Sequence, residues 1–172
     1  MKIAMIGSGA AGSVFASYLR RGGADITLVD PYKEHMDKVA AEGMIFHVSP
    51  EGEYHLTGFK TACSAENIGI MDIVIFMTKS MQLDDAIKTA EPCIGPDTVL
   101  VSVMMVNNES GAVMPIGSMA KLTHRLAPDA IFHTDAVQGF LKLPFQAKTL
   151  GADLISVSSH KVHGPKGAGA LY

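Results

Sequence analysis

The sequence predicts an α/β protein with a doubly wound, mostly parallel sheet and helices on both faces, a three-layer αβα arrangement. Three observations support this prediction. Short apolar segments rich in β-branched residues alternate with segments whose apolar residues recur at helical spacing. Hydrophobic residues make up 48% of the 172 residues and charged residues 18%, which suits a parallel sheet buried on both faces. A turn with three glycines separates the first predicted strand from the first predicted helix.

Local signals set the order of the predicted elements. The first helix ends at Gly22 and Gly23, Pro31 suits the start of the second helix, and Gly151 stops the last one. The predicted strands are residues 2–6, 25–30, 44–48, 54–59, 72–78, 99–103, 130–134 and 154–157, with 44–48 and 54–59 paired as a hairpin. The predicted helices are residues 10–20, 31–41, 83–90, 115–126 and 145–150. Right-handed crossovers predict the sheet order 3-2-1-4-5-6-7, with residues 168–172 as an antiparallel edge.

Composition argues against several classes of function. The net charge of −3, with scattered Lys and Arg, gives no basic surface for nucleic acid. The longest apolar runs, such as residues 73–77 and 99–106, are too short to span a bilayer, and early glycines leave no signal-peptide core. Cys63 and Cys93 lack metal-ligand spacing, so we expect no metal site and a reducing, cytoplasmic setting. We find no linker and expect one domain over residues 1–172, whose open sheet edges would favour a homo-oligomer.

The glycine turn, GSGAAG, predicts a dinucleotide site. Gly7 permits a tight turn, Gly9 lets the backbone approach a pyrophosphate, and Gly12 lets helix and strand pack closely. The first N–H groups of the helix attract phosphate, and Asp30 ends the next strand, where a carboxylate can bind ribose hydroxyls. The predicted Rossmann-like site comprises Gly7, Ser8, Gly9, Ala10, Ala11, Gly12 and Asp30. The alternative is a glycine turn that merely packs.

The first 102 residues resemble the nucleotide domain of the ketopantoate reductase (2-dehydropantoate 2-reductase) family. The matching segments are MKIAMIGSGAAGSVFASYL, ITLVD, the predicted hairpin and IVIFMTKSMQLDDAI. The resemblance implies NADP or NAD as the first-choice cofactor and places Lys79 beside nicotinamide or substrate as a candidate catalytic residue. Asp30 would repel a 2′-phosphate and so favours NAD, while Lys33 leaves NADP open. The family's asparagine-glycine segment after residues 99–103 is replaced by MMVNNESG.

Residues from about 98 to 172 resemble a second family, the cysteine desulfurases among the class-V aminotransferases, which use pyridoxal phosphate (PLP). The matching segments are VSVMMVNNESGAVMPI, FHTDAVQ and DLISVSSHKVHGPKGAGALY. The resemblance implies that Lys161 attaches PLP covalently and that Asp135 binds the pyridine nitrogen. It further implies that Asn107 and Gln138 lie near the phenolic oxygen of PLP and that Ser158 and His160 help to bind its phosphate. The alternatives are that Asp135 caps the following segment and that His160 and His163 are ordinary surface histidines.

The two resemblances predict a hybrid joined within one strand, residues 98–103. Its parts would be a reductase-like portion, 1–102, and a desulfurase-like portion, 103–172. We find no match for the desulfurases' phosphate loop, stacking residue, sulfur-accepting cysteine or arginine, so we expect NAD(P) binding without full turnover and no sulfur transfer. PLP binding at Lys161 is the second hypothesis, and a scaffold that binds neither cofactor is the third. The first and seventh strands would lie roughly 19 Å apart, so the two sites would share an edge but not a pocket.

Overall fold

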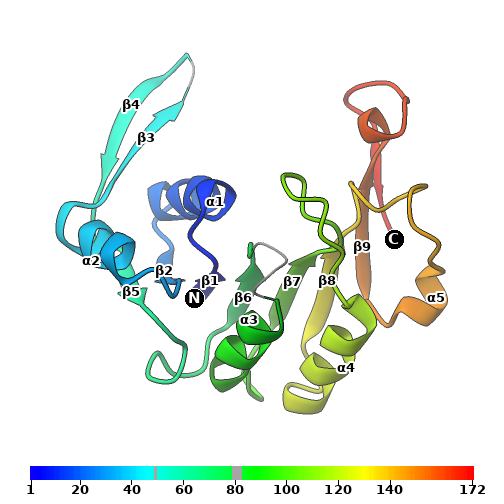
Figure 1. Cartoon of the computed structure of the whole chain (residues 1–172), viewed down its shortest axis with the longest axis horizontal. Helices are drawn as coiled ribbons and strands as arrows, with labels where there is room; N and C mark the ends of the chain where they lie inside the picture. The colour runs from blue at the N-terminus through cyan, green and yellow to red at the C-terminus, as the bar shows by residue number, and fades with distance from the viewer. Residues whose placement is uncertain (49, 79–82) are drawn as a thin grey trace.

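One eight-stranded sheet runs through the protein (Figure 1). The computed structural model describes residues 1–48, 50–78 and 83–172. The sheet order is β10-β9-β8-β7-β6-β1-β2-β5, and the strand pairs are parallel except for the β9–β10 edge. The strands are β1 (Lys2–Ile6), β2 (Asp25–Val29), β5 (Lys60–Ala62), β6 (Ile73–Phe76), β7 (Leu100–Met104), β8 (Ile131–Asp135), β9 (Leu154–Ser158) and β10 (Gly169–Leu171). The predicted fold class, the strand order from β2 to β9 and the antiparallel edge are confirmed, whereas the strand beside β2 is β5, which was not among the predicted strands.

The predicted hairpin is also confirmed, but the strand that follows it was missed. β3 (Met44–Val48) pairs with β4 (Gly52–Leu56) in a separate two-stranded sheet that projects from the body in Figure 1. The prediction extended the second hairpin strand to residue 59, whereas the chain turns at Gly58 with φ +77°. It then forms β5, which pairs parallel with β2 at the outer edge of the main sheet.

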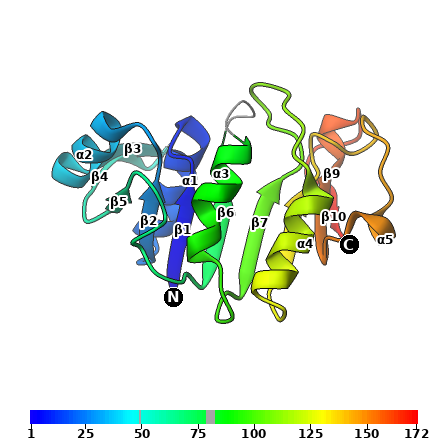
Figure 2. The same cartoon turned by 60° about the horizontal axis from the view of Figure 1, so that its bottom comes forward.

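Helices lie on both faces of the sheet, as predicted. The helices are α1 (Ala10–Arg21), α2 (Lys33–Glu42), α3 (Leu83–Ala90), α4 (Ile116–Leu126) and the short α5 (Ala147–Leu150). α1 and α2 pack on β1 and β2, where Ala16 and Met36 contact the same cluster as Met5 and Leu28. α3 and α4 lie together on the opposite face, in front of the strands in Figure 2. No helix in the described part of the chain is long and apolar enough to cross a bilayer.

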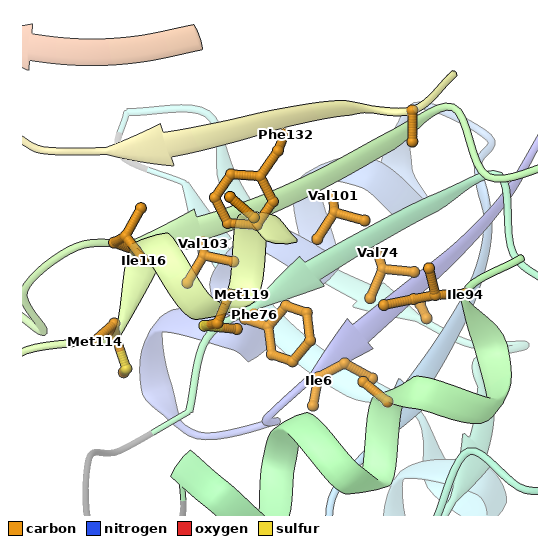
Figure 3. Packing of buried hydrophobic residues seen from close by; sticks show 14 of the residues in the cluster. Ile6, Val74, Phe76, Ile94, Val101, Val103, Met114, Ile116, Met119 and Phe132 are labelled. Atoms are coloured by element: carbon orange, nitrogen blue, oxygen red, sulfur yellow. The ribbon is translucent and has the colours of Figure 1, made fainter. Parts of the chain in front are cut away.

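The larger hydrophobic core is continuous across the middle of the sheet. Val101 and Val103 of β7 are each 1% exposed and lie between residues of β6 and β8. Their neighbours include Phe76 of β6 and Phe132 of β8, together with residues of α4 (Figure 3). Burial of such side chains stabilises a fold by about 1.5–3 kcal/mol each. The segments before and after β7 therefore share one core rather than two.

Polar residues alternate with these valines on the other face of the same strands. Ser102 Oγ lies 2.8 Å from His133 Nδ1, and His133 Nε2 lies 3.2 Å from Ser156 Oγ, so one imidazole links β7, β8 and β9. Burial lowers the pKa of His133, while the nearby Asp135 carboxylate opposes that shift. The imidazole is therefore held in its neutral form, and each ring nitrogen has a hydroxyl partner.

We predict that His133 makes the protein sensitive to mild acid. As pH falls below about 6.5, the unfolded chain takes up a proton at this histidine before the folded chain does, so the free energy of unfolding decreases. His133→Gln removes this proton uptake, and its free energy of unfolding should fall less steeply between pH 7.5 and 5.5. Urea denaturation across that range measures the slope for both proteins. Identical slopes would contradict the prediction.

Candidate functional site

The glycine turn joins β1 to α1 in the conformation that its sequence predicts. Gly7 has φ +98°, and a Cβ atom there would lie 2.8 Å from the carbonyl oxygen of Met77. A Cβ on Gly12 would overlap the carbonyl oxygen of Gly7. Gly9 differs, because a Cβ there would have no atom within 4 Å and its φ of −70° suits any residue. Packing thus requires Gly7 and Gly12, whereas Gly9 leaves open space beside the turn.

The start of α1 faces this open space without a side-chain cap. Gly9 is the N-cap residue, and the first turn contains no acidic residue. The first N–H groups of a helix have no acceptor within the helix and present a partial positive charge. Ser8 is buried and its N–H donates to Asp30 instead of to a ligand. Ala10 and Ala11 remain as the backbone donors of the turn that line the cavity described below.

Asp30 is fixed just beyond the end of β2. Its Oδ2 accepts the N–H of Ser8 at 2.8 Å, and its Oδ1 accepts the N–H of Tyr32 at 3.0 Å. The carboxylate is half-buried and therefore stands at the edge of the turn in one orientation. Lys33, the residue that left NADP open, forms an ion pair with Asp37 at 2.6 Å, and that partner raises its pKa. The ammonium of Lys33 is thus paired on the exposed surface of α2.

A cavity of about 340 Å³ lies against the turn. Its described lining residues follow or end β1, β2, β6 and β7 or belong to α1 and α3. They are Ile6, Gly7, Gly9, Ala10, Ala11, Val29, Asp30, Pro31, Met77, Thr78, Thr89, Asn107 and Glu109. A volume of this size is within the range of small-molecule sites. Sequence reasoning identified the glycines, the alanines and Asp30 but missed Met77, Thr78 and Glu109. Only their positions after neighbouring strands, β6 and β7, could have indicated them.

Asn107, which the second resemblance assigns to PLP, lines this cavity. It is 8% exposed, and its Oδ1 accepts the N–H groups of Glu109 and Ser110 and the Ser110 hydroxyl. Its Nδ2 lies 3.5 Å from the carbonyl oxygen of Thr78. The side chain therefore stabilises its own turn and contacts the end of β6.

The remaining PLP candidates lie farther along the same sheet edge. Asp135 ends β8, is half-buried and accepts the N–H of Val137 through Oδ1 at 2.9 Å. Ser158 ends β9, and Lys161 follows in the 3₁₀ turn Ser159–Lys161 with its side chain exposed. Asp135 is the register partner of Ser156 on β9, so β8 and β9 bring the carboxylate and the lysine segment to neighbouring strand ends.

Ser158, His160 and Gln138 have hydrogen-bond partners within the protein, and Lys79 falls outside the described residues. Ser158 Oγ lies 2.6 Å from His160 Nδ1, and Gln138 Oε1 accepts the ammonium of Lys142 at 3.1 Å. Within the described ranges, no group of three His, Cys, Asp or Glu side chains could hold a metal ion.

Comparison with known proteins gives class-V relatives by sequence and structural neighbours of both expected kinds. The model of the aminotransferase class-V family matches residues 55–172. Cysteine desulfurase IscS from Anaeromyxobacter dehalogenans (strain 2CP-C) is 36% identical over 148 residues, which cover 79% of this chain and 34% of that protein. Among solved structures, 2-dehydropantoate 2-reductase from Methylococcus capsulatus has a TM-score of 0.58 at 17% identity, covering 91% of this chain and 40% of its own. A NifS-like protein has a TM-score of 0.57 at 23% identity, and the match covers 99% of this chain and 34% of that protein.

These comparisons confirm the class-V resemblance and, for the reductase, the fold. The family match begins at residue 55, before β5, whereas the predicted resemblance began near residue 98. The matched part of the chain spans 17% to 34% of the length of these curated relatives. The two structural similarities show that one sheet is comparable with both a reductase fold and a NifS-like fold. Since the family model matches more than half of the sequence, the chain belongs to the aminotransferase class-V family.

Proposed function

We propose that the protein binds a nicotinamide dinucleotide at the glycine turn, as a binding module rather than a complete oxidoreductase. The cavity beside Gly7, Gly9 and Asp30 is the observation that supports this proposal. Lys79, which the reductase resemblance places beside the nicotinamide, lies outside the described residues, so the proposal is limited to binding.

The residues around the cavity fit a dinucleotide in three respects. The missing Cβ at Gly9 leaves room for the backbone to approach a pyrophosphate. The uncapped start of α1 offers N–H donors and a partial positive charge to that anion. The fixed carboxylate of Asp30 can accept the two hydroxyls of a ribose at the end of β2.

The same residues favour NAD over NADP. A 2′-phosphate would approach the Asp30 carboxylate, and charges at such distances repel by about 1–4 kcal/mol near a protein surface. Lys33 is the candidate for offsetting this repulsion, but its ammonium is paired with Asp37. The proposal therefore ranks NAD(H) ahead of NADP(H).

We predict that NADH binds at least about tenfold more tightly than NADPH, which corresponds to roughly 1.4 kcal/mol. Asp30→Asn removes the charge and keeps one of the two oxygens that accept the N–H groups of Ser8 and Tyr32, so this preference should shrink. Titration of nicotinamide fluorescence with both proteins measures the two affinities. Equal affinities in the unchanged protein would contradict the assignment of Asp30, and no response to either dinucleotide would contradict the proposed function.

A second prediction contrasts two glycines of the same turn. Gly9→Val should leave the melting temperature nearly unchanged, because its Cβ meets no atom, yet weaken NADH binding by more than about tenfold through overlap with the pyrophosphate. Gly12→Ala should instead destabilise the fold by about 1–3 kcal/mol, because its Cβ overlaps Gly7. Differential scanning fluorimetry and NADH titration separate these effects. Lys161→Ala is the matched control and should bind NADH normally.

PLP attachment at Lys161 is a second candidate function, favoured by the family match and by the Lys161 and Asp135 positions. PLP, when bound, acts as an electron sink for reactions of amino acids. The residues present have the chemical groups that this cofactor needs. Lys161 offers an exposed amine, and Asp135 offers a half-buried carboxylate at the end of the neighbouring strand. Ser158 and His160, already hydrogen-bonded to each other, would bind the phosphate.

We predict selective labelling of Lys161 by PLP. After incubation with PLP and borohydride reduction, peptide mass mapping should find the label on Lys161 in preference to Lys166, which lies in the following turn. Asp135→Ala should reduce this labelling, because it removes the carboxylate that binds the pyridine nitrogen. Uniform labelling of surface lysines would contradict a PLP site.

A further inference from the structure

Thr78 has a buried hydroxyl group that makes no hydrogen bond with the described residues. It follows β6, is 9% exposed and lines the cavity beside the glycine turn. In the part of the chain that the structure describes, its Oγ1 is a buried side-chain oxygen without a hydrogen-bond partner. Such groups are rare in folded proteins because burial removes their bonds to water. A ligand in the cavity is the partner that would restore this bond.

The amide of Asn107 lies next to Thr78 and has a fixed orientation. Three donors, the N–H groups of Glu109 and Ser110 and the Ser110 hydroxyl, bind Oδ1 and so identify the other terminal atom as nitrogen. That Nδ2 group makes a single long contact, 3.5 Å, with the Thr78 carbonyl oxygen. An amide nitrogen has two N–H donors, so at least one N–H group of Asn107 Nδ2 is available to a ligand.

The sheet order determines which end of a dinucleotide these two residues face. β1 and its glycine turn lie between β2, which ends at Asp30, and β6, which leads to Thr78. A pyrophosphate bound at the turn therefore directs one nucleoside towards Asp30 and the other towards Thr78 and Asn107. Glu109 also lines the cavity. Its carboxylate disfavours a phosphate there and favours a neutral group with hydroxyl or amide donors.

Resting on the proposed dinucleotide binding, we infer that Thr78 and Asn107 form a subsite for the nicotinamide riboside end. The hydroxyl of Thr78 can donate or accept, and Nδ2 of Asn107 can only donate. A group with both a donor and an acceptor satisfies the pair, and the carboxamide and the ribose hydroxyls of that end have this chemistry. Thr78 follows β6 and Asn107 follows β7. In the sequence they therefore lie before and after β7, the strand where the two resemblances meet.

The test compares Thr78→Val with Thr78→Ser against three ligands by isothermal titration calorimetry. ADP lacks the second nucleoside, ADP-ribose adds the ribose, and NADH adds the nicotinamide. Thr78→Val should bind NADH about fivefold to tenfold more weakly and ADP with unchanged affinity, while Thr78→Ser should bind both normally. A parallel loss for ADP-ribose assigns the ribose hydroxyls as the partner, and a loss for NADH alone assigns the carboxamide.

Two further measurements make the inference independent of folding defects. Without ligand, Thr78→Val should melt at the same temperature as the unchanged protein or higher, because valine has the shape of threonine and lacks the unpartnered hydroxyl. Asn107→Asp keeps the acceptor oxygen and removes the donor, so it too should weaken NADH more than ADP. Equal losses for ADP and NADH, no loss for either, or a lower melting temperature of Thr78→Val would overturn the subsite. Failure of the unchanged protein to bind ADP or NADH would overturn the proposed function itself.

Discussion

The parallel pairing of β7 on both of its edges is the constraint on which the rest of the structure depends. Val101 pairs in register with Val74 of β6 and with Phe132 of β8, so the strand has no free edge. Its valines are buried in the cluster that contains Phe76 and Phe132. If β7 were an outer strand, this core would open to water on one side and both flanking segments would lose apolar contacts.

This central strand also decides where chemistry can occur. Parallel strands present their carboxyl ends at one edge of a sheet, so the segments after β1, β2, β6 and β7 meet beside the glycine turn. Asp135 and Lys161 follow β8 and β9 on that same edge, separated from β1 by β6 and β7. The class-V match therefore includes residues at two places on this edge. Met77, Thr78, Asn107 and Glu109 line the cavity beside the glycine turn, and Asp135 and Lys161 follow β8 and β9.

The elements with strong local signals could be predicted from the sequence. The apolar runs of β1, β6 and β7 and the three glycines specify buried strands and a tight turn regardless of context. β5 could not be predicted, because three residues, Lys60–Ala62, give no periodicity and their pairing with β2 depends on the distant hairpin. Thr78 and Glu109 lie in the segments that carry the two resemblances, but neither was assigned a role there, and only the strand order places them at the cavity.

Asn107 lies in a segment matched to one family and lines a cavity beside the glycine motif expected for another. Its segment matches a PLP family, and its amide was expected beside the ring that Asp135 would hold. In the folded chain, Oδ1 binds three donors of its own turn, which leaves Nδ2 as the only group free to meet a ligand. Rotation of the side chain would deprive those three donors of this acceptor. In this arrangement the one group that Asn107 offers to a ligand is Nδ2, which lies at the cavity beside the glycine turn.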